Sequence, residues 1–316
     1  MRTCLTILIY LVFPGIIYSQ NATIDSLENV VRTSKNDSTL SLAYTELASN
    51  YFGYDNQKGL DALNKAWNIV NRHSWNYNKG YFYNAKSDIR FYQGQYEQSL
   101  AMADSSIHFY LKAKQEANPA TRKEAEFLLA DMNASKGVTY ATMNKRDTAI
   151  TYYLKGLELL EKTDHPRKAG KIGTCLINMG SLYFSMGQND KALEYNLKAI
   201  PYHVASGDDE MACYNYVFVA STFTQMNKYD SAQKYFVIAL PLIKKLNKPA
   251  INIEYYGKTG LLHAALKEWR QAVDDYNKAY SNAVTVNDAY NQCFYLRLTA
   301  EGYYGEGSYK KAAEGA

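Results

Sequence analysis

Histidine, cysteine and carboxylate side chains are the groups here that could carry out chemistry, and their spacing favours no reaction. The five histidines are scattered, and none has a second histidine or a cysteine at metal-ligand spacing. Carboxylates fall mostly on positions expected to face solvent; a paired general acid and base stays open, but nothing favours one. The sequence contains no glycine-rich phosphate loop and no nucleophile elbow. It therefore predicts no metal site, no cofactor and no catalytic residue, and it favours a protein that is not an enzyme. The histidines are His73, His108, His165, His203 and His263.

Three cysteines, Cys175, Cys213 and Cys293, follow the first 20 residues of the chain. Their number is odd, and each falls near the start of an expected helix. We interpret them as small core residues and not as a disulfide framework.

Tyrosine is the one residue in excess, with 30 in the chain. Tyrosine offers a wide contact area and a polar tip at little entropy cost, which suits the binding of peptides or sugars. It also fills wide interfaces between helices, so the sequence leaves both roles open. The tyrosines that do not fall on expected packing positions are Tyr81, Tyr83, Tyr202, Tyr214, Tyr216, Tyr255, Tyr256, Tyr290 and Tyr304.

A period of 40 residues organises the elements that would position these groups, and its clearest mark is a column of alanines. A fixed period of this size is typical of helical hairpins stacked into an array. The alanines are Ala192, Ala232, Ala272 and Ala312, and Ala149 holds the same place one repeat earlier. Small residues stand twelve positions before this column, at Gly137, Gly180, Ala220, Gly260 and Ala300. Rings follow three residues later, at Tyr140, Tyr183, Phe223, His263 and Tyr303. Residues that can end a helix come next, at Asn144, Gly187, Asn227, Lys267 and Gly307.

This pattern resembles the tetratricopeptide repeat family, which has small residues at repeat positions 8, 20 and 27, aromatic residues at 11 and 24, and Gly or Asn at 15. The small residues let two helices approach closely while the rings fill the space beside them. Gly or Asn can adopt the left-handed conformation that ends the first helix. Repeats counted in this way start near residues 130, 173, 213, 253 and 293, with weaker copies near 80 and 40. The resemblance implies an all-α, right-handed α-solenoid of about seven helical hairpins.

The repeats are longer than the 34 residues usual in the family. Pro166 and Pro249, at position 37, stand two residues after Asp164 and Asn247. This arrangement predicts that Asp164 and Asn247 cap the next helix. The second helices should then run past position 32, and each helix should span about 16–18 residues, or about 24–27 Å.

Two further prolines, Pro201 and Pro241, fall at position 29, inside the second helix of consecutive repeats. Proline removes a backbone donor and crowds the carbonyl four residues earlier. We therefore predict a kink in each of these helices.

Residues 1–20 have the pattern of a secretory signal peptide: Arg2, an apolar run, and Ser19 as the last residue removed. The apolar run is too short for a spanning helix, and an uncleaved N-terminal anchor is the alternative. The mature chain, residues 21–316, is then an exported solenoid, for which the bacterial periplasm fits best. Gly315 and Ala316 fall at positions 23 and 24, so the array is expected to be truncated at its C-terminal end.

The formal net charge of +4 is spread along the chain, with Lys and Arg interspersed among Asp and Glu. This distribution argues against nucleic acid and against a strongly anionic membrane as partner. No transmembrane helix is expected in the mature segment.

The family lines its concave groove with positions 2, 5, 9 and 12 of the first helix. Chaperone-binding members clamp a peptide carboxylate with Lys at position 5, and this chain has no Lys there, so that function is not implied. The candidate ligand-binding residues are Tyr214, Ser221, Glu254 and Arg297, which combine an aromatic face, a hydroxyl and two opposite charges. The alternative is that Tyr214 packs against the next repeat and that Glu254 and Arg297 are solvated charges. Other groove positions hold Tyr81, Asn84, Asp88 and Phe91.

The resemblance implies a non-enzymatic scaffold that recognises a peptide or protein segment, or a small envelope ligand. We expect it to be the sensing part of a longer envelope regulator. One alternative is an accessory array of an envelope enzyme or assembly factor whose catalytic domain lies beyond residue 316. The other is a self-contained secreted binding protein.

Overall fold

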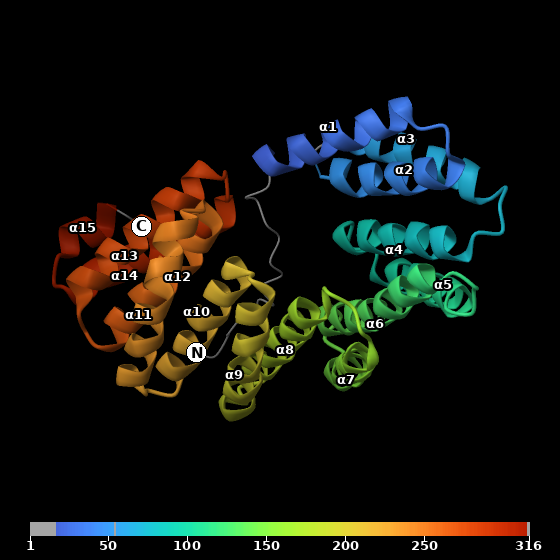
Figure 1. The fold of residues 1–316 in the computed structure, drawn as a ribbon. Coiled ribbons are helices and arrows are strands. Elements are labelled where there is room, and N and C mark those ends of the chain that lie inside the picture. Colours follow the sequence, from blue (N-terminus) through green and yellow to red (C-terminus); the bar gives the residue numbers. More distant parts are fainter. Residues whose placement is uncertain (1–16, 54, 315–316) are drawn as a thin grey trace. The chain divides into compact units, whose positions relative to one another are not determined.

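The computed structural model describes residues 17–53 and 55–314, with side chains from residue 23 to residue 313. Within these residues the chain forms 15 helices and no strand (Figure 1). The helices are α1 Ile17–Thr33, α2 Asp37–Tyr51, α3 Asn56–Val70, α4 Asn76–Tyr92, α5 Tyr96–Ala113, α6 Pro119–Thr142, α7 Arg146–Lys162, α8 Lys168–Ser185, α9 Asn189–Ser206, α10 Asp209–Gln225, α11 Tyr229–Leu246, α12 Pro249–Ala265, α13 Trp269–Thr285, α14 Ala289–Gly305 and α15 Tyr309–Glu314.

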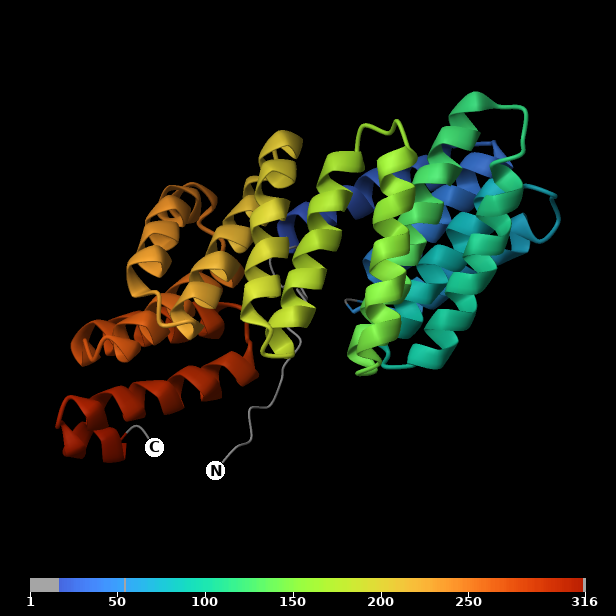
Figure 2. The same ribbon diagram turned by 90° about the horizontal axis from the view of Figure 1, so that it is seen from below.

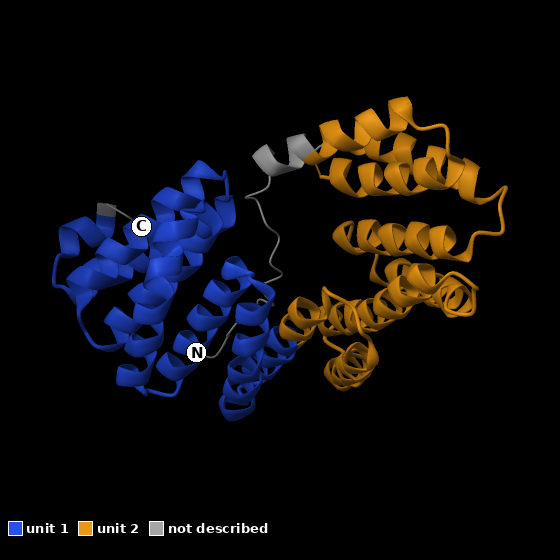
Figure 3. Cartoon of the chain, viewed as in Figure 1, with its two compact units in different colours: residues 1–15, 176–316 blue, residues 16–175 orange. Residues whose placement is uncertain are grey.

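The helices belong to two compact units, each of which is described by itself (Figure 3). Within the described residues, the N-terminal unit ends at Cys175 and the C-terminal unit begins at Leu176. In the first, α2 packs on α3, α4 on α5 and α6 on α7; in the second, α10 packs on α11 and α12 on α13 (Figure 2). First helices of successive hairpins also touch, as α2 and α4 do. The predicted all-α array of helical hairpins is confirmed.

Left-handed residues close the turns between the helices of each hairpin, as the sequence predicts. They have φ values of 58° at Asn144, 71° at Gly187, 57° at Asn227, 62° at Lys267 and 81° at Gly307. The next N–H then reaches back to the ring residue at position 11, as in the 2.8 Å bond from Lys145 N to Tyr140 O. This bond satisfies a carbonyl that the end of the first helix would otherwise leave unpaired.

Small residues and rings have the packing roles predicted for them. Ala149, Ala192, Ala232 and Ala272 are all fully buried, with 0% exposure. A Cβ placed on Gly137 would lie 2.6 Å from the ring of Tyr153, and one on Gly260 would lie 2.6 Å from the ring of Tyr276. Atoms do not pack that closely, so glycine at position 8 is what lets the first helix touch the ring at position 24.

The second helices are as long as predicted, but their neighbours are capped differently. α9 and α11 each have 18 residues and run through Pro201 and Pro241, while the predicted kinks stay predictions. Asn247 is wrongly predicted as an N-cap: it ends α11 in the left-handed conformation, and Lys248 precedes α12. Asp164 is also wrongly predicted, because a turn at Pro166 intervenes and α8 begins only at Lys168.

The cysteines of the described residues are free; Cys175 and Cys213 are buried as predicted. Cys293 is exposed on α14, so its assignment to the core is wrong. Most of the predicted signal peptide, residues 1–16, lies outside the described residues, and export stays a prediction. No helix in the described part of the chain is long and apolar enough to cross a membrane.

Candidate functional site

Tyr214, the aromatic member of the predicted site, lies in the core of the C-terminal unit. It is 3% exposed and belongs to a cluster with Val217 and Ile251. Burial raises the pKa of its hydroxyl above the ordinary value, and the nearby charge of Glu254 adds to the shift. The prediction that Tyr214 lines an open face is wrong, because α12 packs on α10 and covers this side chain.

The other three predicted residues do not gather around Tyr214 into one site. Ser221 on α10 and Glu254 on α12 are half-buried, and Arg297 on α14 is exposed. Arg297 forms an ion pair with Glu301 one turn further along its own helix. The structure therefore brings Glu254 near Tyr214 and leaves Arg297 engaged elsewhere; ligand binding by these residues stays a prediction.

The first helices of the N-terminal unit also carry polar groups, and Tyr81 at position 2 is one of them. Tyr81 on α4 donates a hydrogen bond from its hydroxyl to the carboxylate of Glu46 on α2. Its ring stacks on that of Tyr77 with centroids 6.3 Å apart. Burial, with the charge of Glu124 as the next cause, raises the pKa of Tyr77 to about 12. These tyrosines are therefore neutral hydrogen-bond donors at physiological pH.

Glu124 on α6 anchors the chain segment just before α8. His165 Nε2 lies 2.8 Å from Glu124 Oε2, and the guanidinium of Arg167 pairs with the same carboxylate. The ring of Phe127 stacks on His165 at 4.1 Å and lies 4.6 Å from the Arg167 guanidinium. These contacts fix the start of α8 against α6 and so position the residues that follow.

Asp88 on α4 is an exposed residue whose carboxyl pKa is nevertheless strongly raised. Desolvation by the protein mass around the side chain raises this pKa from 3.8 to about 7; repulsion by Asp131 adds to the shift and Lys171 opposes it. Lys171 Nζ lies 2.9 Å from Asp131 Oδ2. No described residue forms a hydrogen bond or ion pair with Asp88. Its carboxylate is therefore available to an outside group.

Tyr92 stands one turn after Asp88 on α4 and is 68% exposed. Partial desolvation of the hydroxyl by the surrounding protein, with the charge of Asp88 as the second cause, raises its pKa. Asp88, Tyr92, Asp131 and Lys171 are called the Asp88 cluster from here on. The cluster offers a carboxylate and an aromatic face side by side, a combination that attracts cations.

Sequence reasoning found part of this cluster and missed the rest. Asp88 falls on groove position 9 of the weak repeat that starts near residue 80, and Asp131 falls on position 2 of the repeat that starts near residue 130. Lys171 precedes position 1 of the repeat near residue 173, where no groove residue is expected. The first helices of these long repeats start earlier than usual, as α8 does at Lys168. That early start is the signal that could have identified Lys171.

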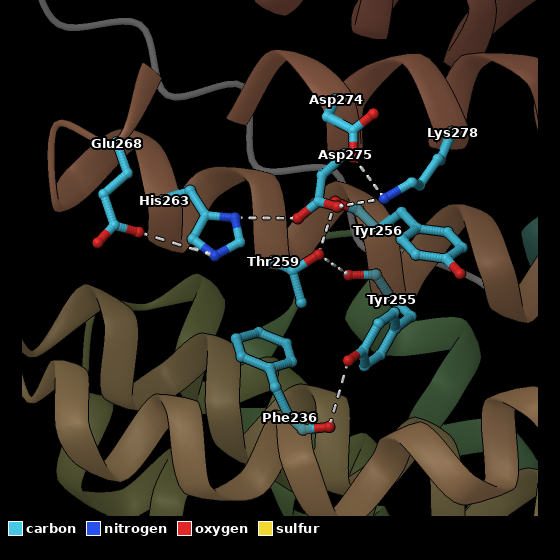
Figure 4. A network of polar contacts seen from close by, with 9 residues as sticks. All are labelled: Phe236, Tyr255, Tyr256, Thr259, His263, Glu268, Asp274, Asp275 and Lys278. Atoms are coloured by element: carbon cyan, nitrogen blue, oxygen red, sulfur yellow. Dashed lines mark hydrogen bonds and ion pairs between the residues drawn. The ribbon is translucent and has the colours of Figure 1, made fainter. Parts of the chain in front are cut away.

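A separate polar network ties α12 to α13 in the C-terminal unit (Figure 4). His263 Nδ1 lies 3.0 Å from Asp275 Oδ2, and His263 Nε2 lies 3.9 Å from Glu268 Oε2. Lys278 Nζ lies 3.4 Å from Asp275 and 2.6 Å from Asp274. The hydrogen bond to Asp275 raises the pKa of His263. Each charge has a partner, so this network holds a hairpin together and offers no free group to a ligand.

Metal binding finds no support in the described part of the chain. No three His, Cys, Asp or Glu side chains there are placed to hold a metal ion.

Comparisons with known proteins identify the type of repeat. The model of the tetratricopeptide repeat family matches residues 130–162 and 174–200. These matches fall on the repeats predicted to start near residues 130 and 173. No curated protein sequence matches the chain.

Solved structures with a similar fold cover nearly all of the chain. The apo form of RapI has a TM-score of 0.65 at 14% identity, over 95% of this chain and 81% of that one. Aspartyl phosphate phosphatase F from Bacillus subtilis has a TM-score of 0.64 at 16% identity, over 92% and 72%. NprR in complex with its cognate peptide NprX has a TM-score of 0.60 at 16% identity, over 95% and 84%. At these identities the likeness shows the fold alone, a tetratricopeptide-like array.

Proposed function

We propose that this chain is a non-enzymatic scaffold that recognises a peptide or protein segment, and that the Asp88 cluster receives a positively charged group of that ligand. The observation that carries the proposal is the exposed carboxylate of Asp88, which has no ionic partner among the described residues. A unit charge at about 4 Å from a carboxylate gains about 4 kcal/mol at an effective dielectric constant near 20. The face of Tyr92 adds a cation–π contact.

The protonation of Asp88 makes this recognition depend on pH. With a pKa of about 7, the carboxyl is near half ionised at neutral pH in the free protein. A bound cation favours the charged form and pulls the pKa down. Affinity for a basic ligand should therefore rise as the pH increases from 6 to 8.

The comparisons support a peptide as the class of ligand. One of the similar structures, NprR, is described with its cognate peptide NprX. Arrays of this kind present side chains from successive helices along an extended surface, which suits a peptide better than a compact small molecule.

A peptide array tests the proposal directly. The mature chain is incubated with an array of random heptapeptides, and the residues enriched among the binders are determined. We expect Lys or Arg to be enriched for the parent chain and the enrichment to be lost in Asp88→Asn. Glu161→Gln, which alters an exposed carboxylate on α7, is the matched control and should behave like the parent. Binders without a basic residue, or binding that Asp88→Asn leaves unchanged, would overturn the proposal.

We also propose that the chain is exported to the bacterial periplasm. The support is the signal-peptide pattern of residues 1–20, which predicts that the exported protein begins at Gln20 or Asn21. N-terminal sequencing of protein from the envelope fraction tests this. Intact Met1 in that fraction would contradict cleavage.

The wider role that we propose is the sensing part of a longer envelope regulator. One of the structures with a similar fold, an ATPase from Pyrococcus horikoshii, is described as having a tetratricopeptide repeat sensor; this chain covers 44% of it. The reading frame downstream of Ala316 tests the role. A membrane helix followed by a kinase or DNA-binding domain is the expected result. A catalytic domain of another class would favour an accessory array, and an immediate stop codon would favour a self-contained secreted binding protein.

A further inference from the structure

The core-facing side of α9 is polar where the equivalent side of every neighbouring second helix is apolar. Asn196 at position 24 and His203 at position 31 are both 0% exposed. The same two positions hold a ring and an aliphatic residue, or a ring and an alanine, in the neighbouring repeats. They are Tyr153 and Leu160 in α7, Phe236 and Ile243 in α11, and Tyr276 and Ala283 in α13, and all are buried.

Asn196 takes the place of a ring in the contact with the first helix of its own repeat. A Cβ placed on Gly180 would lie 2.3 Å from Asn196 Oδ1. In the equivalent contacts, the hypothetical Cβ atoms of Gly137 and Gly260 meet tyrosine rings. The Asn196 amide therefore presses on the backbone of α8 at a point where apolar packing is the rule.

Asn215, on the other side of the interface between α9 and α10, also stands where other repeats have a ring. It is at position 3 of its repeat, in α10, and the same repeat position holds Tyr255 in α12 and Tyr295 in α14. Tyr255 packs on Phe236 with ring centroids 5.9 Å apart, and Tyr295 packs on Tyr276 at 6.3 Å (Figure 4 shows the first pair). Because α9 packs on α10, the register places Asn215 opposite Asn196. An amide pair thus stands where the next two interfaces have an aromatic pair.

The amides have no protein partner for their polar atoms. Asn215 is also 0% exposed. Neither the nitrogen nor the oxygen of either side chain forms a hydrogen bond with a protein group in the described residues. Buried amides are nearly always hydrogen-bonded, because burial without a bond sacrifices the bonds that water makes. Two asparagines also fill much less volume than the two aromatic side chains that stand at the equivalent positions of the next interfaces.

We propose that the α9–α10 interface contains an internal water site, in which ordered water molecules bridge the side-chain amides of Asn196 and Asn215. Water is the ligand that fits, because a buried water typically makes about three hydrogen bonds to groups that the protein leaves unsatisfied. The amides supply donors and acceptors on both sides of the interface. The site occurs at this one of the aligned interfaces between described repeats, because the others carry an aromatic, aliphatic, methionine or cysteine side chain or an alanine at the same two positions.

A water site makes a prediction for nuclear magnetic resonance of the mature chain. With ¹⁵N-labelled asparagine, the side-chain NH₂ protons of Asn196 and Asn215 should show rotating-frame cross-peaks to a long-lived water. Asn287→Asp and other single exchanges assign the remaining asparagine signals. Amides without such cross-peaks, or bonded to each other or to backbone carbonyls, would overturn the proposal. A cross-peak to a bound organic molecule would overturn it too, because the ligand would then not be water.

A reciprocal exchange of the two interfaces provides the second test. The double variant Asn196→Phe, Asn215→Tyr copies the Phe236–Tyr255 pair and should raise the urea midpoint of unfolding while abolishing the water cross-peaks. The matched variant Phe236→Asn, Tyr255→Asn should lower the midpoint and create a second long-lived water. If the first variant lowers the midpoint although it folds, the space between the amides is too small for water and the proposal fails. If that variant does not fold, the cross-peaks of the parent chain alone decide.

Discussion

Tyr81 and Tyr214 stand at the same repeat position, position 2 of a first helix, one in the N-terminal unit and the other in the C-terminal unit. Tyr81 is half-buried and gives its hydroxyl to Glu46. Tyr214 is 3% exposed and lies in a cluster with Ile251. The neighbouring first helix decides the outcome: α2 leaves Tyr81 half-buried beside a carboxylate, whereas α12 covers Tyr214 with Ile251 and also brings Glu254 near it. Repeat position alone therefore does not assign a tyrosine to binding or to the core.

The two units also differ in whether particular charged side chains have ionic partners. In the C-terminal unit, Arg297 pairs with Glu301, and Asp275 is shared by His263 and Lys278. In the N-terminal unit, Asp88 has no partner among the described residues, although neighbouring groups raise its pKa. Unsatisfied charge near an aromatic face favours binding over packing, so recognition is proposed for the N-terminal unit.

The largest effect that could break this comparison is that of Tyr214→Ala. Removing a buried aromatic side chain should lower the free energy of unfolding by about 3–5 kcal/mol. Tyr92→Ala in the N-terminal unit is the matched control and should change it by less than about 0.5 kcal/mol, because Tyr92 is exposed. Urea unfolding of both variants measures this. Small and equal changes in the free energy of unfolding for the two variants would show that Tyr214 lies on an open face.

Position 20 should behave alike in both units, and Ala232→Leu measures how closely its helices meet. Ala232 is fully buried, so the added atoms should destabilise the chain by roughly 1–3 kcal/mol. Ala149→Leu in the N-terminal unit should cost a similar amount. Ala205→Leu, on the exposed side of α9, is the control and should cost little. An unchanged midpoint for Ala232→Leu would show that the repeat register is wrong.

The charge of Asp88 should make stability depend on pH in the N-terminal unit. Its pKa is 3.8 in a free chain and about 7 here, so the folded state holds the proton more strongly and stability falls as pH rises through that window. Asp88→Asn removes this loss. The free energy of unfolding of the variant should therefore rise relative to that of the parent between about pH 4 and 7, and the difference, the lead of the variant, should stay constant above pH 7.

The lead of Asp88→Asn should grow by about 1.4 kcal/mol for each unit by which folding raises the pKa of Asp88, and solvent screening at this exposed side chain lowers the pKa shift and the lead together. Urea unfolding at several pH values measures the difference, with Glu161→Gln as the control. A lead that does not change with pH would show that the pKa of Asp88 is ordinary, and the proposed cation site would lose its main support.

The sequence predicts the helix-ending residues and the buried alanines because both follow from the backbone and from distances within one hairpin. Asn144 and Gly187 are examples, since few other residues tolerate their φ values. The sequence does not predict the roles of residues whose surroundings depend on the next helix. Tyr214 is covered by α12, and the charge state of Asp88 depends on Asp131 and Lys171 from two other helices. The exchange of rings for Asn196 and Asn215 is visible in the aligned repeats, but its meaning requires their burial.

The smallest expected effect sharpens the one feature that both units share, the left-handed turn inside each hairpin. Lys267 adopts φ 62°, where Gly187 and Gly307 stand in other repeats. A residue with a Cβ is destabilised by about 1 kcal/mol in this conformation, and glycine is not. Part of this advantage of glycine is lost because glycine has more conformational freedom in the unfolded chain. Lys267→Gly should therefore stabilise the chain by about 0.5 kcal/mol. Because Lys267 is exposed, the exchange removes no core packing. The reverse change, Gly187→Lys, should lower stability by at least as much, and urea midpoints at constant m value compare the two. If Lys267→Gly were destabilising, the lysine side chain would have to hold the turn, and the backbone account of the helix stops would fail at that repeat.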